Sequence, residues 1–211
     1  MASPHDDDEG VVASTVPLYP PMLRICCDGS WHPDKCEMAC GCQGMYYYDW
    51  QNADDGMDVL PLGFADGGAF ASGELLFEAL HRMRGTFSAT FSEWFAIANA
   101  IDKARRRILE AKPAQRILSV KIYSDADTVI NVLNDNVTHM TQQTVRLACF
   151  VEVLVARLKE ECKVQEVSFS WRPRDTPMMV RAHDLSQRAH LQAPALQDGG
   201  IYRLFMREQA D

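Results

Sequence analysis

Four carboxylates stand where an α/β sheet places reactive acids. Asp28 ends a buried-looking apolar run, and Asp125 ends a second strand-like run. Glu93 lies in the first turns of a long predicted helix, and Asp184 lies in the last predicted helix. Because the ends of neighbouring central strands and the starts of helices meet at one rim of such a sheet, we expect the four acids to lie together.

A cluster of four carboxylates predicts metal binding. Clustered carboxylates repel one another and shift one another's pKa values. Divalent cations relieve that repulsion, and carboxylate oxygens are hard ligands that suit Mg²⁺ or Mn²⁺. Two such ions about 4 Å apart stabilise the attacking and leaving oxygens of an in-line phosphoryl displacement. The residue types therefore predict a two-ion centre for phosphoryl transfer.

Each acid also has a structural interpretation when it is taken alone. Asp28 precedes Gly29 and suits a turn. Glu93 complements a helix dipole, and Asp125 suits a helix N-cap. Asp184 suits a solvent-facing position on its helix. The metal-centre hypothesis therefore depends on the joint order and placement of the four acids.

Hydrophobic periodicity predicts strands and helices after an acidic, Pro-rich tail over residues 1–21, which we expect to be disordered. Short links between the first three strands favour an antiparallel meander, whereas helices between the later strands favour parallel crossovers. The sequence therefore predicts a mixed five-stranded sheet in an α/β fold. The predicted strands cover residues 22–27, 37–48, 57–65, 116–127 and 164–173, and the predicted helices cover 72–83, 88–111, 127–135, 141–162 and 180–191.

Four short segments resemble, in order, the signature segments of the type-1 ribonuclease H domain. They are "CDGS" (27–30), "SEWFAIANAI" (92–101), "YSDADTVINVL" (123–133) and "RAHDLSQRA" (181–189). The resemblance implies a ribonuclease H-like α/β fold with sheet order 3-2-1-4-5 and helices on both faces. The expected domain spans residues 22–193 with an insertion near 66–87, and residues 194–211 form a C-terminal extension.

The resemblance also implies an activity, a cofactor and site residues. The implied activity is cleavage of the RNA strand of RNA–DNA hybrids by two Mg²⁺ or Mn²⁺ ions, which leaves a 3′-hydroxyl and a 5′-phosphate. The implied catalytic acids and metal ligands are Asp28, Glu93, Asp125 and Asp184. The expected substrate-binding residues include hydroxyls and amides near a helix start, which suit a phosphate; they are Gly29, Ser30, Thr90, Ser92 and Arg174.

The loop before the last helix departs from the family pattern. Arg174 or Asp175 stands near the position where the family often has a histidine. His183 is interpreted as a packing or surface residue, because adjacent residues of a helix point in different directions. The departures leave a second hypothesis open, a catalytically retired module that binds nucleic acid or a protein partner. A third hypothesis is a phosphohydrolase on another α/β fold.

Composition and charge set further expectations. The formal net charge is −8, so the chain lacks the overall basic footprint of a sequence-independent nucleic-acid binder. A bound polyanion therefore needs a local basic patch or metal ions. The seven cysteines are an odd number and no apolar signal core precedes them, which favours reduced thiols in the nucleus, cytoplasm or mitochondrion. We expect a monomer that does not contact a membrane, since no apolar run is long enough to span one.

Overall fold

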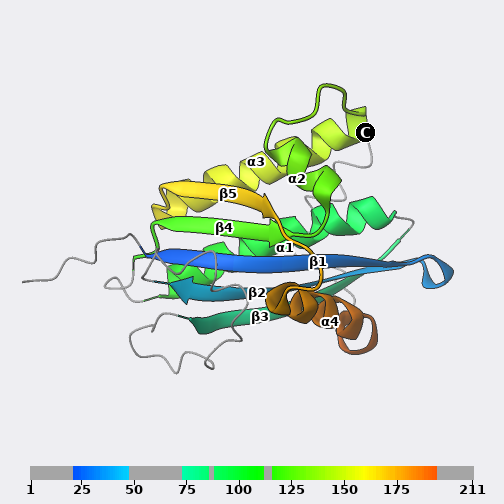
Figure 1. Ribbon diagram of the computed structural model, residues 1–211, viewed down its shortest axis with the longest axis horizontal. Coiled ribbons are helices and arrows are strands. Elements are labelled where there is room, and N and C mark those ends of the chain that lie inside the picture. The colour runs from blue at the N-terminus through cyan, green and yellow to red at the C-terminus, as the bar shows by residue number, and fades with distance from the viewer. Residues whose placement is uncertain (1–20, 48–72, 86–87, 112–115, 194–211) are drawn as a thin grey trace, which may run out of the picture.

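The described part of the chain forms one mixed sheet with helices on both faces (Figure 1). The computed structural model describes residues 21–47, 73–85, 88–111 and 116–193. The strands are β1 (Met22–His32), β2 (Glu37–Tyr47), β3 (Glu74–Arg84), β4 (Ser119–Ser124) and β5 (Glu166–Trp171). The helices are α1 (Ala89–Glu110), α2 (Asp127–Leu133), α3 (Gln142–Cys162) and α4 (Pro177–Gln192), and a 3-10 turn covers Pro33–Lys35.

The strand order β3-β2-β1-β4-β5 confirms the predicted sheet. β1 pairs antiparallel with β2, and β2 pairs antiparallel with β3, as short connections allow. β1 pairs parallel with β4, and β4 pairs parallel with β5, because α1 and the α2–α3 pair serve as crossovers. Two parallel strands, β1 and β4, therefore lie at the centre of the sheet.

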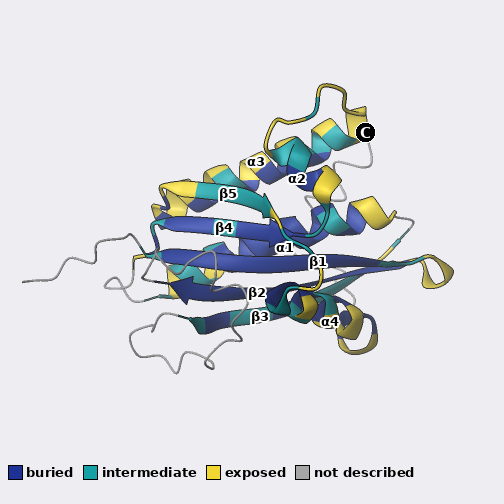
Figure 2. Ribbon diagram, in the orientation of Figure 1, coloured by how far each residue is buried: buried dark blue, intermediate teal, exposed yellow. Residues whose placement is uncertain are grey.

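Side chains that alternate along the strands form two apolar layers, one on each face of the sheet (Figure 2). Leu23 and Ile25 of β1 belong to the larger layer with α1 and α3. Cys27 belongs to the same layer as Ile25. Cys26, which lies between them in the sequence, packs in the other layer with Met178 of α4. Both faces of β1 and β2 are thus covered, and Figure 2 shows these strands buried along nearly their whole length. Any polar group on a central strand must find a partner inside the fold.

The third strand is where the sequence-based prediction was wrong. The helix predicted over residues 72–83 is β3, the edge strand beside β2. A register shift between Gly44 and Met45 of β2 marks a bulge in this pair, and the adjacent residues Leu76 and Phe77 consequently face the same layer. A strand that contributes apolar side chains to both layers and is interrupted by a bulge shows apolar residues at helix-like spacing. The predicted strand over 57–65 lies outside the described residues, as do the tail up to residue 20 and the extension from 194.

Two further features bear on the sequence-based expectations. The cysteines are free thiols, and Cys26, Cys27, Cys40 and Cys42 are buried in the sheet layers. Free cysteine behaves there as a small apolar residue. Among the helices that the structure describes, none combines the length and the apolar character needed to cross a bilayer.

Candidate metal centre

Three of the four predicted acids converge at one end of the central parallel pair. The register between β1 and β4 pairs Cys26 with Tyr123, so Asp28 and Asp125 follow on the same face. β4 ends at Ser124, whereas β1 continues along β2 to His32, so beyond this point β1 has no parallel neighbour among the described strands. Glu93 of α1 reaches the same opening. One carboxylate oxygen of Asp28, Glu93 and Asp125 each lies within 4.8 Å of the others. We call these three residues the carboxylate centre.

The approach of α1 to β1 depends on Gly29. Its backbone N–H donates to Oε2 of Glu93 at 3.2 Å. A Cβ atom at Gly29 would lie 2.3 Å from the carbonyl carbon and oxygen of Ser92, which is closer than atoms can approach without a shift of backbone. The glycine after Asp28 therefore lets the first turn of α1 rest against the strand, and this contact brings Glu93 to the centre.

Burial and mutual repulsion make the carboxylate centre electrostatically unfavourable without cations. The pKa of Glu93 lies well above its ordinary value, because of burial first and then the nearby charges of Asp28 and Asp125. Burial also raises the pKa of Asp28, and a hydrogen bond from Ser186 partly offsets that rise. Three hard oxygen donors gathered at one place suit a divalent cation of the Mg²⁺ or Mn²⁺ type. The residues present therefore fit such an ion.

Glu93→Gln is expected to stabilise the metal-free fold at neutral pH. The folded-state pKa of Glu93 exceeds its unfolded value, so the wild type loses stability as the pH rises through the folded-state pKa. Glutamine keeps the oxygen that accepts from Gly29 and does not ionise. In EDTA at neutral pH, we expect the free energy of unfolding to rise by about 1 kcal/mol, measured by urea unfolding.

The gain from Glu93→Gln should vanish as the pH falls toward the ordinary glutamate pKa of 4.5. Glu110→Gln is the matched control, because Glu110 is exposed and pairs with Arg107 on the helix surface. The control should change stability by less than about 0.5 kcal/mol at every pH. Equal stability of Glu93→Gln and the wild type across the whole pH range would contradict the account of the centre's electrostatics.

Arg174 places a positive charge directly on the carboxylate centre. Its Nε donates to Oδ2 of Asp125 at 2.6 Å, and its Nη2 donates to Oδ1 of Asp28 at 3.4 Å. The side chain of Arg174 is 57% exposed, so the guanidinium contacts the acids on one side and solvent on the other. The predicted contact residue in this loop thus lies at the centre, with part of its side chain open to solvent.

The last helix presents His183 to the centre, and Asp184 lies elsewhere. Nδ1 of His183 lies 3.2 Å from Oδ2 of Asp28, and the hydroxyl of Ser186 donates to the same oxygen at 2.5 Å. Asp184 is exposed and is not among the three acids that the structure brings together. The sequence predicts Asp184 as a metal ligand and His183 as a packing or surface residue, and the structure differs on both.

Helical periodicity gives the physical reason for this difference. The buried residues Ala182, Leu185 and Ala189 define the face of α4 that packs on the sheet. At 100° per residue, position 184 points away from that face and position 183 flanks it. Counting the apolar positions of α4 would have identified His183 and Ser186 in advance, whereas matching the aspartate by residue type did not.

Only part of the predicted substrate-binding set faces solvent. Ser92 is buried, and its hydroxyl donates to the carbonyl oxygen of Ala89 at 2.6 Å. Ser30 is also buried, with its hydroxyl 2.9 Å from Nε2 of His190. Thr90, in contrast, is exposed in the first turn of α1. Of the predicted set, Thr90 and Arg174 therefore have side chains that are accessible from solvent.

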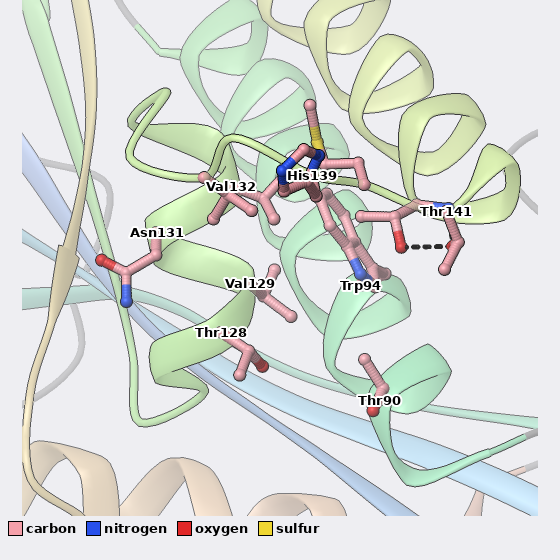
Figure 3. A pocket seen from close by; sticks show the side chains of 11 residues that line it. Thr90, Trp94, Thr128, Val129, Asn131, Val132, His139 and Thr141 are labelled. Atoms are coloured by element: carbon pink, nitrogen blue, oxygen red, sulfur yellow. Dashed lines mark hydrogen bonds between the residues drawn. The ribbon is translucent and has the colours of Figure 1, made fainter.

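Thr90 lies on the rim of a hollow between α1, α2 and the start of α3 (Figure 3). The cavity has a volume of about 300 Å³. Trp94 and Val129 are buried and form its apolar floor, while the hydroxyls of Thr90, Thr128 and Thr141 line it. Because Thr90 shares a helical turn with Glu93 and Thr128 follows Asp125 at the start of α2, the hollow adjoins the carboxylate centre.

Comparison with known proteins identifies the fold. No family model matches the chain, and no curated protein matches its sequence. Many solved structures match in shape, and three of them are compared at 14% sequence identity. RNase H1 from the halophilic archaeon Halobacterium salinarum gives a TM-score of 0.55 over 82% of this chain and 99% of that one. LC11-RNase H1, solved in complex with an RNA/DNA hybrid, gives 0.53 over 79% and 95%. The N-terminal RNase H domain of a Mycobacterium tuberculosis protein gives 0.52 over 80% and 92%. The chain therefore has the ribonuclease H fold that its signature segments predicted.

Proposed function

We infer that this protein is a divalent-metal-dependent nuclease that cleaves the RNA strand of RNA–DNA hybrids. The observation that carries the proposal is the convergence of Asp28, Glu93 and Asp125 at the end of the central parallel strands of a ribonuclease H fold. The four signature segments support the same substrate class, and LC11-RNase H1, which shares the fold, was solved with an RNA/DNA hybrid.

The reaction is hydrolysis of one phosphodiester. The oxygen of water bonds to phosphorus, the bond from phosphorus to the 3′ oxygen breaks, and that oxygen takes up a proton to leave a 3′-hydroxyl and a 5′-phosphate. A divalent ion bound at the carboxylate centre supplies Lewis acidity and neutralises developing negative charge. The chain itself holds the three carboxylates in place through the contact of Gly29 with α1 and the contact of Ser186 with Asp28.

Substrate binding uses the exposed groups around the centre. Arg174 offers a guanidinium that pairs with a phosphate in a bidentate manner, and its side chain is open to solvent. Thr90 and Thr128 offer hydroxyls along the adjoining hollow, and threonine hydroxyls commonly contact nucleic-acid backbones. With a formal net charge of −8, the chain has little long-range attraction for a polyanion, so these local contacts and the metal ion have to supply the affinity.

A second candidate is a retired module that binds nucleic acid or a protein without cutting it. The observation in its favour is the same Arg174 ion pair, because a guanidinium seated on Asp28 and Asp125 neutralises the acids without a metal ion. The two candidates differ in whether a bound hybrid is hydrolysed.

A substrate panel tests the proposal. The full chain is incubated with Mg²⁺ or Mn²⁺ and, in separate reactions, with an RNA–DNA hybrid labelled on either strand, with duplex DNA, with duplex RNA and with single-stranded RNA. We expect cleavage of the RNA strand of the hybrid alone, and no cleavage in EDTA. Binding of the hybrid without cleavage would overturn the proposal in favour of the retired module.

A further inference from the structure

The charges at the carboxylate centre differ from those of a site built for two divalent ions. Three ionised carboxylates carry three negative charges. On the α4 side of Asp28, its carboxylate contacts His183 and Ser186, and neither of these side chains carries a negatively charged oxygen. Two divalent ions would therefore exceed the charge of the acids even without the guanidinium of Arg174.

We propose that the centre binds one divalent cation and that Arg174 supplies the second positive charge of the reaction. This inference rests on the proposed function. One divalent ion and one guanidinium together carry three positive charges, which equal the charge of Asp28, Glu93 and Asp125 when all three are ionised. An in-line displacement needs positive charge near both the attacking and the leaving oxygen, and a guanidinium can serve at one of these positions.

The loop between β5 and α4 holds Arg174 at the centre. The backbone N–H of Arg172 donates to the carbonyl oxygen of Ser124 at 3.0 Å, which ties the loop to the end of β4. The Trp171 indole N–H donates to the carbonyl oxygen of Asp125 at 3.2 Å. Thr176 closes the turn through its backbone N–H and hydroxyl, both of which donate to the carbonyl oxygen of Pro173. Contacts on both sides of Arg174 thus fix its backbone beside the acids.

The position of the guanidinium suits contact with a phosphate. Two of its nitrogens face Asp125 and Asp28, and the exposed part of the side chain faces outward. A phosphate that reaches a metal ion between Asp28, Glu93 and Asp125 would lie against the same guanidinium. The arginine would therefore supply positive charge to a phosphate oxygen that reaches the carboxylate centre.

Mn²⁺ binding by the full chain without nucleic acid tests the inference. Electron paramagnetic resonance of the free ion gives the number of ions bound per chain and their affinity. We expect one Mn²⁺ per wild-type chain. Arg174→Ala should still bind one ion and bind it about tenfold more tightly, because a repelling charge is removed. Arg174→Lys keeps the charge but not the two-nitrogen contact, so its affinity should lie closer to the wild type than that of Arg174→Ala does.

A double variant tests whether the centre can be made to bind a second Mn²⁺ ion. Arg174→Ala combined with His183→Asp places a fourth carboxylate beside Asp28 and removes the guanidinium, so we expect two Mn²⁺ per chain. Circular dichroism checks its fold, and the pair Arg174→Ala and Arg174→Lys decides the question if the double variant does not fold. Two ions on the wild type, no tightening in Arg174→Ala, or one ion on a folded double variant would each overturn the inference.

The outcome separates this inference from the proposed function. A wild-type chain that binds one Mn²⁺ but cleaves no hybrid refutes the nuclease and leaves the ion count intact. A chain that cleaves the hybrid while binding two ions refutes the one-ion inference alone. A chain that binds no Mn²⁺ refutes both.

Discussion

Asp125→Asn is expected to reduce cleavage of the RNA strand of an RNA–DNA hybrid by at least about a thousandfold. Asp125 contributes one of the three oxygens that converge at the carboxylate centre, and it also pairs with Arg174. The amide has nearly the same shape as the carboxylate but removes one negative charge from the metal site. Loss of metal-supplied stabilisation of the transition state costs several kcal/mol, and each 1.36 kcal/mol is a factor of ten in rate. Single-turnover cleavage of a labelled hybrid in Mg²⁺ measures the effect.

Asp184→Asn is the matched control for this prediction. Both variants exchange an aspartate for asparagine within a signature segment, but Asp184 is exposed and lies outside the carboxylate centre. We expect the rate of Asp184→Asn to stay within about threefold of the wild type, since surface substitutions change little. A loss in Asp184→Asn equal to that in Asp125→Asn would contradict the placement of α4 and restore the four-acid site predicted from the sequence.

Gly29→Ala is expected to lower the free energy of unfolding by about 3 kcal/mol and to weaken the metal centre. The new Cβ would lie 2.3 Å from the backbone carbonyl of Ser92 and 2.6 Å from the backbone nitrogen of Glu93. Neither backbone atom can move without displacing the first turn of α1 from β1. The shift would also break the hydrogen bond between Gly29 and Glu93. Urea unfolding measures the stability, and Mn²⁺ titration measures the loss of affinity.

Gly44→Ala separates this effect from the general cost of replacing a strand glycine. A Cβ at Gly44 would lie 2.4 Å from the ring of Phe77, which is the far end of a flexible side chain on the edge strand β3. The ring can rotate away, so we expect a loss of less than about 1 kcal/mol and unchanged Mn²⁺ affinity. If Gly44→Ala lowers the free energy of unfolding as much as Gly29→Ala does, the close contact of Gly29 with α1 is not the cause of the destabilisation.

The sequence predicted the sheet well where each strand has a simple pattern. The apolar runs of β1 and β4 each end in an acid, and their parallel pairing places Asp28 and Asp125 side by side. The long helix α1 follows from its regular apolar stripe, and its start supplies Glu93. These features depend on local periodicity and on the rule that helices connect parallel strands, and both can be read without a structure.

The features that the sequence did not reveal depend on packing between distant segments. The pattern of β3 predicts a helix, because a bulge opposite Gly44 and apolar side chains in both layers disguise its alternation. The pairing of Arg174 with Asp125 joins residues 49 positions apart and has no signature in local spacing. Which residue of α4 lies beside Asp28, His183 or Asp184, depends on which face of the helix packs on the sheet. Residue type favours Asp184 as the residue near the centre, whereas the buried face of α4 places His183 there.

The proposed nuclease activity depends on the binding of a divalent cation by Asp28, Glu93 and Asp125. A crystal structure of the full chain soaked with Mn²⁺ tests it most directly, because anomalous scattering locates manganese independently of any activity. We expect a manganese peak within bonding distance of oxygens from all three residues, and no peak at Asp184. Saturating Mn²⁺ with no peak at the three carboxylates, or with a peak that includes Asp184, would contradict it.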